Sequence, residues 1–482
     1  MLFTEPLFLF LFLPGVLAAH FFSPRRARNP ILLLASLLFY AWGEREYVIV
    51  LLASILLNYS TGRVLGHIDE IKRRRWLLSL GIVANLVLLA SFKYPGFVIL
   101  NLNRVLGIFH FASLPVPLLH IPLGVSFFSL IGMAYIIDVH RKAISPERKL
   151  RDFSLYMAFF PYLIAGPLTR YGNLAIELVE RRVRLDQFAA GIRRFTMGLG
   201  KKMLIANTLA ITVDSIFKTR LTELSPSLAW LGAICYPVQL YFDISGYADV
   251  AIGLALMFGF HLPENFNYPY VAQSMTDFWR RWHITLVSWF RDYLFYPMSY
   301  RRPAWRIHLN LFIVFLLCGL WHEGSWKFVF WGALHGSILA LERAGLGRQL
   351  LRLPRVVRHL YVILMIIGSC VFVRATSFPD ALRFLARMIG VGSARSEGYG
   401  LSAYLTRPLA FALAVGVVGC LPLLPKLREW LEVFANDLAG FRRNLLDTGV
   451  GLFKLTVLTV IFLASVSLSA AGTYNAFIYF NF

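Results

Sequence analysis

The sequence predicts an all-α integral membrane protein, a polytopic helical bundle of about 11 spans in a single domain covering residues 1–482. Its composition is the first reason. Of 482 residues, 58% are hydrophobic and 15% are charged, and the mean hydropathy is +0.63, too apolar for soluble domains. Apolar segments of about 20 residues, the length that crosses a bilayer core, recur from end to end. No linker rich in Gly, Ser or Pro divides the chain.

The candidate spans follow from these apolar runs. They lie near residues 7–22, 29–43, 46–60, 77–92, 119–138, 153–168, 187–218, 226–260, 307–321, 326–343, 358–374, 408–424 and 450–471. The segments 187–218 and 226–260 are long enough to contain breaks or interfacial pieces. The first segment lacks the positive start of a cleavable signal, and a basic cluster follows it, so we expect it to be retained.

The basic residues indicate the sidedness of the chain. The formal net charge is +22, and the basic residues occupy short loops between apolar runs, as the positive-inside rule describes. Arginines follow the first candidate span at 25–28, a basic run follows the third at 72–75, and residues 1–6 hold no basic residue. We therefore expect membrane lipids rather than nucleic acid as surroundings, and an N-terminus that faces away from the cytoplasm. Two more basic groups, Arg141 to Arg151 and Arg193 to Lys202, fit the same sidedness only if residues 94–139 make a net single crossing.

Several common sites are disfavoured. Neither a Gly-x-Ser-x-Gly nucleophile elbow nor a Walker-type loop occurs. His322 and His335 are 13 residues apart without a third ligand at helical spacing, so we expect no metal, and His335 suits packing between helices beside small residues. The cysteines stand singly in apolar stretches and are expected to be buried. They are Cys235, Cys318, Cys370 and Cys420.

The segment Ser274 to Tyr296 differs from an ordinary span. Ser274 and Asp277 have the spacing of a helix cap, and Pro297 limits the far end. An apolar face at helical spacing contains Trp279, Trp282, His283, Leu286 and Phe290, and Arg280, Arg281 and Arg291 point elsewhere. The pattern predicts an amphipathic helix in the membrane interface. One interpretation is a helix that only anchors the chain, with His283 in a structural role. The other is that His283 belongs to a functional site.

A second irregular stretch, Gly319 to Trp326, interrupts two apolar helices. The helix before it, from about His308, has some 14 residues, fewer than the roughly 20 that cross the bilayer core. His322 is therefore placed part-way into the membrane, where an ionisable side chain indicates function. The alternative is a loop at the interface in which His322 caps a helix end.

A histidine in such a place suits acyl transfer to a hydroxyl. A neutral imidazole can take the proton of an alcohol while the oxygen attacks a thioester or ester carbonyl. Glu323 could tune or orient the imidazole. Asp243 and Asp249 are carboxylates in an apolar run, and we expect them to pair with Arg or Tyr, either structurally or along a substrate path.

Several blocks resemble the membrane-bound O-acyltransferase family, and within it the bacterial branch that contains proteins of alginate O-acetylation and teichoic acid D-alanylation. The blocks are SLLFYAWG (36–43), PLGVSFF (122–128), FPYLIAGP (160–167), YFDISGYAD (241–249), NFNYPY (265–270), FWRRWH (278–283), GLWH (319–322) and, in the alginate type, FIYFNF (477–482). They follow in order over nearly the whole chain.

The resemblance implies a bundle with interfacial and broken helices around a central tunnel. It implies that His322 is the essential histidine, acting as base or covalent nucleophile, and that His283 is a second catalytic residue. The substrate-binding candidates are Trp279, Trp282, Arg280, Arg281, Trp321 and Asp243, with the arginines meeting phosphates of the donor.

The same resemblance implies a multi-pass protein of a bacterial inner membrane. An acetyl group would pass from cytoplasmic acetyl-CoA, with no bound cofactor, to hydroxyls of an exported polysaccharide such as alginate, with periplasmic acetyltransferase proteins as partners. The alternatives are peptidoglycan, cellulose or teichoic acid as acceptor, or a non-enzymatic component of polysaccharide export.

One position departs from this branch, which usually has a small residue after the essential histidine, as in Trp-His-Gly. Here Glu323 follows His322, and Lys327 stands four residues after Glu323. Donor or acceptor preference could differ accordingly, but a pair of opposite charges at this spacing is first expected to pair on a helix surface.

Overall fold

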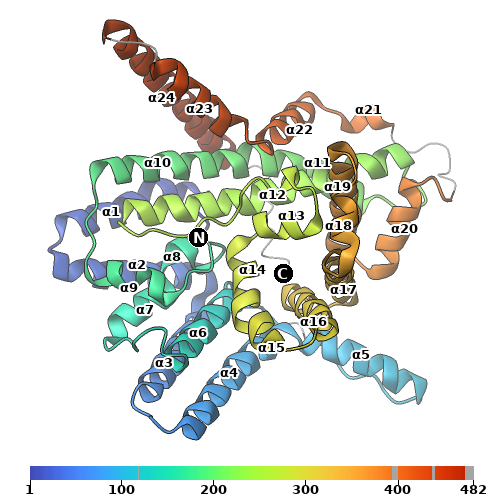
Figure 1. Ribbon diagram of the computed structural model, residues 1–482. Helices are drawn as coiled ribbons and strands as arrows, with labels where there is room; N and C mark the ends of the chain where they lie inside the picture. The colour runs from blue at the N-terminus through green and yellow to red at the C-terminus, as the bar shows by residue number, and fades with distance from the viewer. Residues whose placement is uncertain (118, 393–399, 437–439, 473–482) are drawn as a thin grey trace.

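The computed structural model describes residues 1–117, 119–392, 400–436 and 440–472. Every regular element in these ranges is a helix, as the sequence predicted (Figure 1). The aromatic block 477–482 lies outside the described residues. The four cysteines are all buried and unbridged, as expected.

Six helical segments in the described ranges are long and apolar enough to cross a membrane, and a bent seventh, α22 with α23, qualifies if it counts as one span. The six are α2 with α3 (Arg25–Glu44, Val48–Leu65), α4 (Ile71–Lys93), α12 (Pro226–Met257), α16 (Ala304–His322), α19 (Arg355–Arg374) and α24 (Gly440–Ala470). Shorter apolar helices cover Phe8–Phe22, Pro95–Ile108 and Val125–His140. This is a multi-pass membrane protein. In the described ranges, fewer helices meet this test of length and hydropathy than the roughly 11 spans expected.

The long helix α12 lies at the centre of the molecule, beside α10 (Leu185–Gly200) (Figure 1). Glycines set the distance between these two helices. A Cβ on Gly198 would lie 2.7 Å from the Gly246 carbonyl oxygen, and a Cβ on Gly253 would lie 2.5 Å from the Phe195 nitrogen. Small residues at the crossing let the two backbones touch, as in packed membrane helices.

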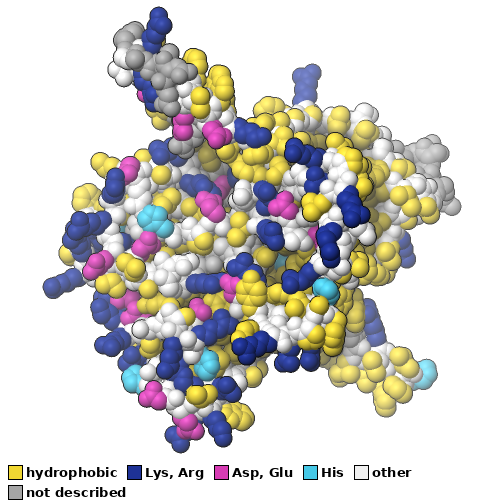
Figure 2. All heavy atoms as spheres, viewed as in Figure 1, with side chains coloured by type: hydrophobic (Ala, Val, Ile, Leu, Met, Phe, Trp, Pro, Cys, Tyr) yellow, Lys and Arg dark blue, Asp and Glu magenta, His cyan; other side chains and the backbone are white. Residues whose placement is uncertain are grey.

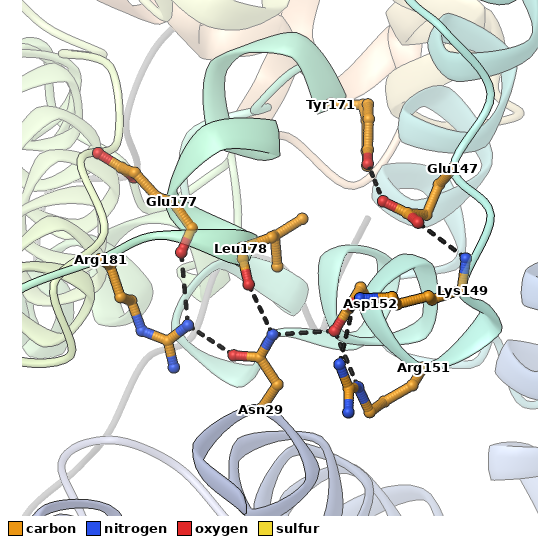
Figure 3. A network of polar contacts seen from close by, with 9 residues as sticks. All are labelled: Asn29, Glu147, Lys149, Arg151, Asp152, Tyr171, Glu177, Leu178 and Arg181. Carbon is orange, nitrogen blue, oxygen red and sulfur yellow. Dashed lines mark hydrogen bonds and ion pairs between the residues drawn. The ribbon is translucent and has the colours of Figure 1, made fainter. Parts of the chain in front are cut away.

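A polar network fixes the first helices against one another (Figure 3). The buried Asn29 of α2 donates to Asp152 Oδ1 of α7 (Leu150–Ala158) at 2.9 Å and to the Leu178 carbonyl of α9 (Tyr171–Val179) at 2.7 Å. Arg181 donates to the side-chain oxygen Oδ1 of Asn29 at 2.5 Å. Because each amide group has a partner, burying this asparagine is not penalised.

The span expected at 153–168 is not one helix. Helix α7 ends at Ala158, a single turn α8 follows (Phe160–Leu163), and irregular backbone leads to α9. Pro161 cannot continue the ladder of α7 because it has no N–H. Side chains satisfy buried backbone amides of this segment instead: Phe160 N donates to Ser36 Oγ at 3.1 Å and Leu168 N to Thr285 Oγ1 at 3.0 Å. Buried irregular backbone of this kind is tolerated inside a membrane protein.

The span expected at 119–138 starts later, at Val125, as α6 (Val125–His140). The preceding Gly124 has a φ of +78°, and a Cβ there would lie 2.6 Å from the Leu163 carbonyl oxygen. Glycine is required at this turn on both grounds. The loop before α6 therefore stays outside the helix and packs onto the irregular segment after α8.

The remaining helices surround this core. They include α1 (Leu13–Phe22), α5 (Pro95–Ile108), α11 (Asn207–Lys218), α17 (Trp326–Leu341), α18 (Gly347–Leu350), α20 (Phe378–Met388), α21 (Leu401–Tyr404), α22 (Arg407–Gly419) and α23 (Leu423–Asn436). Helices α5, α23 and α24 project away from the body (Figure 1). Figure 2 shows many Lys and Arg side chains on the face where α13 (Met275–Arg281), α14 (Ile284–Phe290) and α15 (Tyr296–Ser299) lie.

Candidate active site

His322 is the last residue of α16, which packs tightly against α17. A Cβ on Gly319 would lie 2.2 Å from the Phe328 carbonyl oxygen, and a Cβ on Gly332 would lie 2.4 Å from that of Phe315. The hairpin therefore depends on glycine at both positions. Helix α16 has 19 residues and begins at Ala304, not near His308. The expected 14 residues were too few because interfacial Trp and Arg residues belong to the first turn.

The break that follows His322 is short and surrounded by aromatic rings. Glu323, Gly324 and Ser325 are not helical, and α17 begins at Trp326, so the predicted interruption is confirmed. The His322 ring lies 4.9 Å from that of Trp321, 6.0 Å from Phe328 and 5.5 Å from Trp331, measured between centroids. These rings restrict the orientation of the imidazole.

His322 borders an open cavity of about 430 Å³. The same cavity is bordered by Trp321 and Glu323, by Lys93 at the end of α4, and by the loop and first turn around Ser126. Lys93 Nζ donates to Ser126 Oγ at 3.2 Å and lies 5.4 Å from the centre of the Trp321 ring. A ligand in this cavity would therefore meet an imidazole, an ammonium group and an indole.

His283 lies at a sharp break, which corrects the single amphipathic helix expected over 274–296. The cap is as predicted, since Ser274 Oγ accepts from Asp277 N at 3.0 Å. However, α13 ends at Arg281, His283 takes a φ of +46°, and α14 begins at Ile284. Pro297 does not end the segment either; it occupies the first turn of α15, where proline is tolerated.

Asn265 holds this break in place and explains why the helix does not continue. Its carbonyl oxygen accepts from Ile284 N at 2.9 Å. Its side-chain oxygen accepts from Thr285 N at 3.2 Å and Thr285 Oγ1 at 2.9 Å. Thr285 Oγ1 in turn accepts from Leu168 N at 3.0 Å. The start of NFNYPY is thereby joined to the residues that directly follow FWRRWH and FPYLIAGP, next to His283.

The two candidate catalytic histidines belong to one region. His283 is 4% exposed, and burial lowers the pKa of its imidazole to about 4. The ring is therefore neutral at pH 7, and its Nδ1 is buried without a partner among the described residues. His322 interacts electrostatically with Lys93, and it would also interact with His283 if that ring were protonated. The sequence placed these histidines 39 residues apart; the fold brings them within range of each other.

The candidate tryptophans occupy different places. Trp279 Nε1 donates to His335 Nδ1 at 3.3 Å, and its ring lies 5.7 Å from Trp331, which contacts His322. Trp282 packs instead between Phe266 and Phe278, at 5.2 and 5.5 Å. Trp279 thus contacts Trp331, which in turn contacts His322. Trp282 supports the break at His283. His335 is buried on α17 beside glycines, as predicted.

The charged candidates divide similarly. Arg280 is exposed, whereas Arg281 pairs with Asp277 at 2.8 Å. Asp249 pairs with Arg194 at 2.7 Å, as expected, and with Lys201 at 2.6 Å. Asp243 lies on α12 and pairs with Lys202 at 2.7 Å, a lysine where arginine or tyrosine was expected; both side chains are 2% exposed. A buried pair of this kind holds α12 against the π-helical turn Lys201–Ala206.

Glu323 and Lys327 are paired at 3.3 Å, as the sequence predicted. The pair does not lie on a helix surface, because Glu323 belongs to the break and only Lys327 belongs to α17. Lys327 also donates to the Ala375 carbonyl at 3.1 Å. The departure from the Trp-His-Gly pattern thus adds an ion pair beside His322.

Sequence reasoning missed Lys93, Ser126 and His120, which border the cavity with His322. A signal existed for two of them. Lys93 is an isolated cation at the end of the apolar run 77–92, and Ser126 belongs to the PLGVSFF block. Neither position reveals its neighbours, because their contact joins α4, α6 and α16, which are far apart along the chain.

Comparison with known proteins places this chain among membrane acyltransferases. The model of the membrane-bound O-acyltransferase family matches residues 139–373, which include both histidines. Similar chains include the probable alginate O-acetylase AlgI of Azotobacter vinelandii, 37% identical over the full length of both chains, and that of Pseudomonas aeruginosa, 42% identical over 82% of this chain and 76% of that one. The peptidoglycan O-acetyltransferase of Helicobacter pylori is 35% identical over 81% and 80%. The chain belongs to the membrane-bound O-acyltransferase family, and it is an acyltransferase rather than a non-enzymatic export component.

Proposed function

We propose that this chain transfers acetyl groups to hydroxyls of an exported polysaccharide, with alginate as the acceptor, and that His322 is its catalytic centre. The observation that carries the proposal is the position of His322, at the end of a glycine-packed hairpin and on the wall of an open cavity. The similarity to alginate O-acetylases over the full length supports the acceptor.

In the proposed reaction, His322 acts as general base. Its neutral imidazole removes the hydroxyl proton as the acceptor oxygen attacks the acetyl carbonyl, and the proton then passes to the departing thiolate. His283 lies at the neighbouring break, which Trp282 supports. Trp321 borders the cavity, and Trp279 packs against Trp331 behind His322. Asp243 stabilises α12 through Lys202. A mechanism with a covalent acetyl-histidine would need His322 in nearly the same position as the general-base mechanism does.

The proposed donor is acetyl-CoA in the cytoplasm, used as a substrate with no bound cofactor. Arg280 is exposed on α13, on a face rich in Lys and Arg (Figure 2). Arginine forks suit phosphate oxygens, and Arg281 would join Arg280 once its bond to Asp277 rearranges. Under the positive-inside rule this face is cytoplasmic.

The architecture in the membrane is part of the proposal. One domain over residues 1–482 lies in a bacterial inner membrane, with about 11 spans that are accompanied by interfacial and broken helices. The acetyl group crosses through a tunnel that passes His322, and periplasmic acetyltransferase proteins receive it or act beside it. A non-helical segment such as that after α8 is compatible with a tunnel wall.

Peptidoglycan is the second candidate acceptor. The similarity to the Helicobacter pylori peptidoglycan O-acetyltransferase, at 35% identity, supports it. The two acceptors share a sugar hydroxyl and differ in charge and location, so product analysis separates them.

The test is ester-linked acetyl on exported polysaccharide and on peptidoglycan in the parent strain, a deletion, and the deletion complemented by wild type, His322→Ala or His308→Ala at equal membrane levels. His308 lies at the opposite end of α16 and is the matched control. We expect polysaccharide acetyl to return with wild type and His308→Ala only. Acetyl lost from peptidoglycan alone would select the second acceptor, and full restoration by His322→Ala would remove His322 from the mechanism.

A further inference from the structure

Lys93, the last residue of α4, is a buried cation without a carboxylate partner. It is 9% exposed. Its Nζ donates to the neutral Ser126 Oγ at 3.2 Å and lies 5.4 Å from the centre of the Trp321 ring. Among the residues that the structure describes, Lys93 makes no ion pair with an acidic side chain. An ammonium group in such surroundings is costly unless a negative charge compensates it.

Acidic side chains around the cavity already have partners. Glu323 contacts Lys327 at 3.3 Å and acts on Lys93 only electrostatically. Glu44 accepts from His120 Nε2 at 2.8 Å and from Leu123 N at 3.1 Å. The described part of the cavity wall therefore leaves the charge of Lys93 for a substrate or for a charge that forms during the reaction.

The chain next to Lys93 is fixed against the break that follows His322. The Tyr94 hydroxyl donates to the Leu320 carbonyl oxygen at 3.1 Å. A Cβ on Gly324 would lie 2.9 Å from Cδ1 of Tyr94, so the break packs directly on that ring. These two contacts join the junction of α4 and α5 to positions before and after His322. Lys93 and His322 thus border one cavity in a fixed relative position before any substrate arrives.

Acyl transfer creates a negative charge at a predictable atom. When the acceptor oxygen bonds to the acetyl carbon, the π electrons of the carbonyl group move to its oxygen, and His322 takes the hydroxyl proton. The oxyanion then restores the carbonyl group as the C–S bond breaks, and the proton on His322 passes to the departing thiolate. Enzymes of acyl transfer stabilise this oxyanion with fixed hydrogen-bond donors. An ammonium group beside the base has the charge and the N–H donors for this task.

We propose that Lys93 is a catalytic residue whose ammonium group donates to the acetyl carbonyl oxygen and stabilises the negative charge that forms there while His322 takes the hydroxyl proton. The inference rests on the proposed function and deepens it, because it assigns stabilisation of the oxyanion to a residue of α4. It holds for any molecule that bears the acceptor hydroxyl. Ser126 and Tyr94 are positioning residues, which hold the ammonium group through their hydrogen bonds.

The test uses sealed inside-out vesicles of inner membrane from the deletion strain, complemented by each variant at equal membrane levels. The chain then stays in its natural membrane, and an added donor reaches the cytoplasmic face. Two labelled donors are compared, acetyl-CoA and dithioacetyl-CoA, in which sulfur replaces the carbonyl oxygen. Sulfur is a weak hydrogen-bond acceptor, so a donor aimed at the reacting carbonyl contributes much less with the dithioester.

Lys93→Met is expected to lower kcat for transfer from acetyl-CoA by about a hundredfold with KM nearly unchanged, because an oxyanion donor is lost. With dithioacetyl-CoA the same substitution should cost less than about tenfold, since little stabilisation was present to lose. Lys93→Arg keeps a cationic donor and should retain more activity than Lys93→Met. Lys72→Met, which changes an exposed lysine at the other end of α4, should use both donors as wild type does.

An unchanged kcat in Lys93→Met, or a rise in KM alone, would overturn the inference. So would an equal loss with both donors, which would make Lys93 a structural residue. The proposed function fails separately, because His322→Gln is measured in the same vesicles and the labelled product is identified. Transfer by His322→Gln at the wild-type rate, or label on a different acceptor, rejects that function and leaves the Lys93 comparison standing. Wild type that uses neither donor would overturn both.

Discussion

The indole nitrogen of Trp279 lies 3.3 Å from Nδ1 of His335 and donates a hydrogen bond to it. This bond joins the FWRRWH segment to α17, and the His335 ring lies 4.7 Å from Trp331, which contacts His322. Because Nδ1 accepts, the neutral His335 ring carries its proton on Nε2. The FWRRWH and GLWH blocks are thus coupled through one hydrogen bond, from Trp279 to His335, and two ring contacts, from His335 to Trp331 and from Trp331 to His322.

Trp279→Phe should lower acetyl transfer by more than about tenfold, since it leaves a buried imidazole nitrogen unsatisfied at a cost of about 1–3 kcal/mol next to the His322 wall. The rate is measured with purified protein in liposomes. Trp230→Phe is the control, because Trp230 Nε1 donates to the Met388 carbonyl at 2.9 Å, between α12 and α20. Equal rates for the two variants would show that the Trp279 bond does not support the site.

Gly332→Ala should destabilise the α16–α17 hairpin. Its new Cβ would lie 2.4 Å from the Phe315 carbonyl oxygen, and backbone cannot move away cheaply, so we expect a loss of about 1–3 kcal/mol. Gly368→Ala on α19 has nothing within 4 Å and should be neutral or slightly stabilising. Thermal unfolding in detergent compares them. A Gly332→Ala protein as stable as Gly368→Ala contradicts the close packing at His322.

Two substitutions of His283 separate the role of its backbone conformation from the role of its imidazole. Its φ of +46° is tolerated better by Asn than by Ala, so His283→Asn should be more stable than His283→Ala by roughly 1 kcal/mol. If the imidazole itself acts in transfer, both variants lose activity despite this difference. Unfolding temperature and acetyl transfer are measured on the same preparations. Activity that follows stability across the pair would reduce His283 to a structural residue.

Glu323 and Lys327 should behave as a unit. Either Glu323→Gln or Lys327→Met alone leaves one charge of a partly buried pair unmatched, and the double variant leaves none. We expect a coupling of about 0.5–2 kcal/mol in a double-mutant cycle of unfolding, with transfer closer to wild type in the double variant than in either single one. Additive effects would mean that the ion pair is not formed in the membrane.

The membrane class, the helical architecture and the two irregular regions were predictable from the sequence, because hydropathy and residue spacing report local structure directly. The break after His322 was found because glycine, glutamate and serine interrupt an apolar run. The break at His283 was not found. Periodicity favours a continuous helix there, and the carbonyl and side chain of Asn265, which capture Ile284 and Thr285, come from another segment.

The start of α16 and the wall of the cavity show the same limit. Arg306 and His308 made the helix look short, although helix ends at an interface carry such residues. Lys93 drew no attention because a terminal lysine usually reaches water. Its burial against Ser126 and Trp321 is a tertiary contact among three distant segments, and one sequence does not encode such a contact in any local pattern.

The central claim is that His322 of this chain carries the acyl transfer. The most direct measurement is transfer of radiolabelled acetyl from acetyl-CoA to oligomannuronate by purified protein in liposomes, with wild type, His322→Gln and His308→Ala compared at equal protein content and equal unfolding temperature. The account predicts transfer by wild type and His308→Ala and a loss of more than about a hundredfold in His322→Gln. Transfer by His322→Gln at the wild-type rate would contradict it.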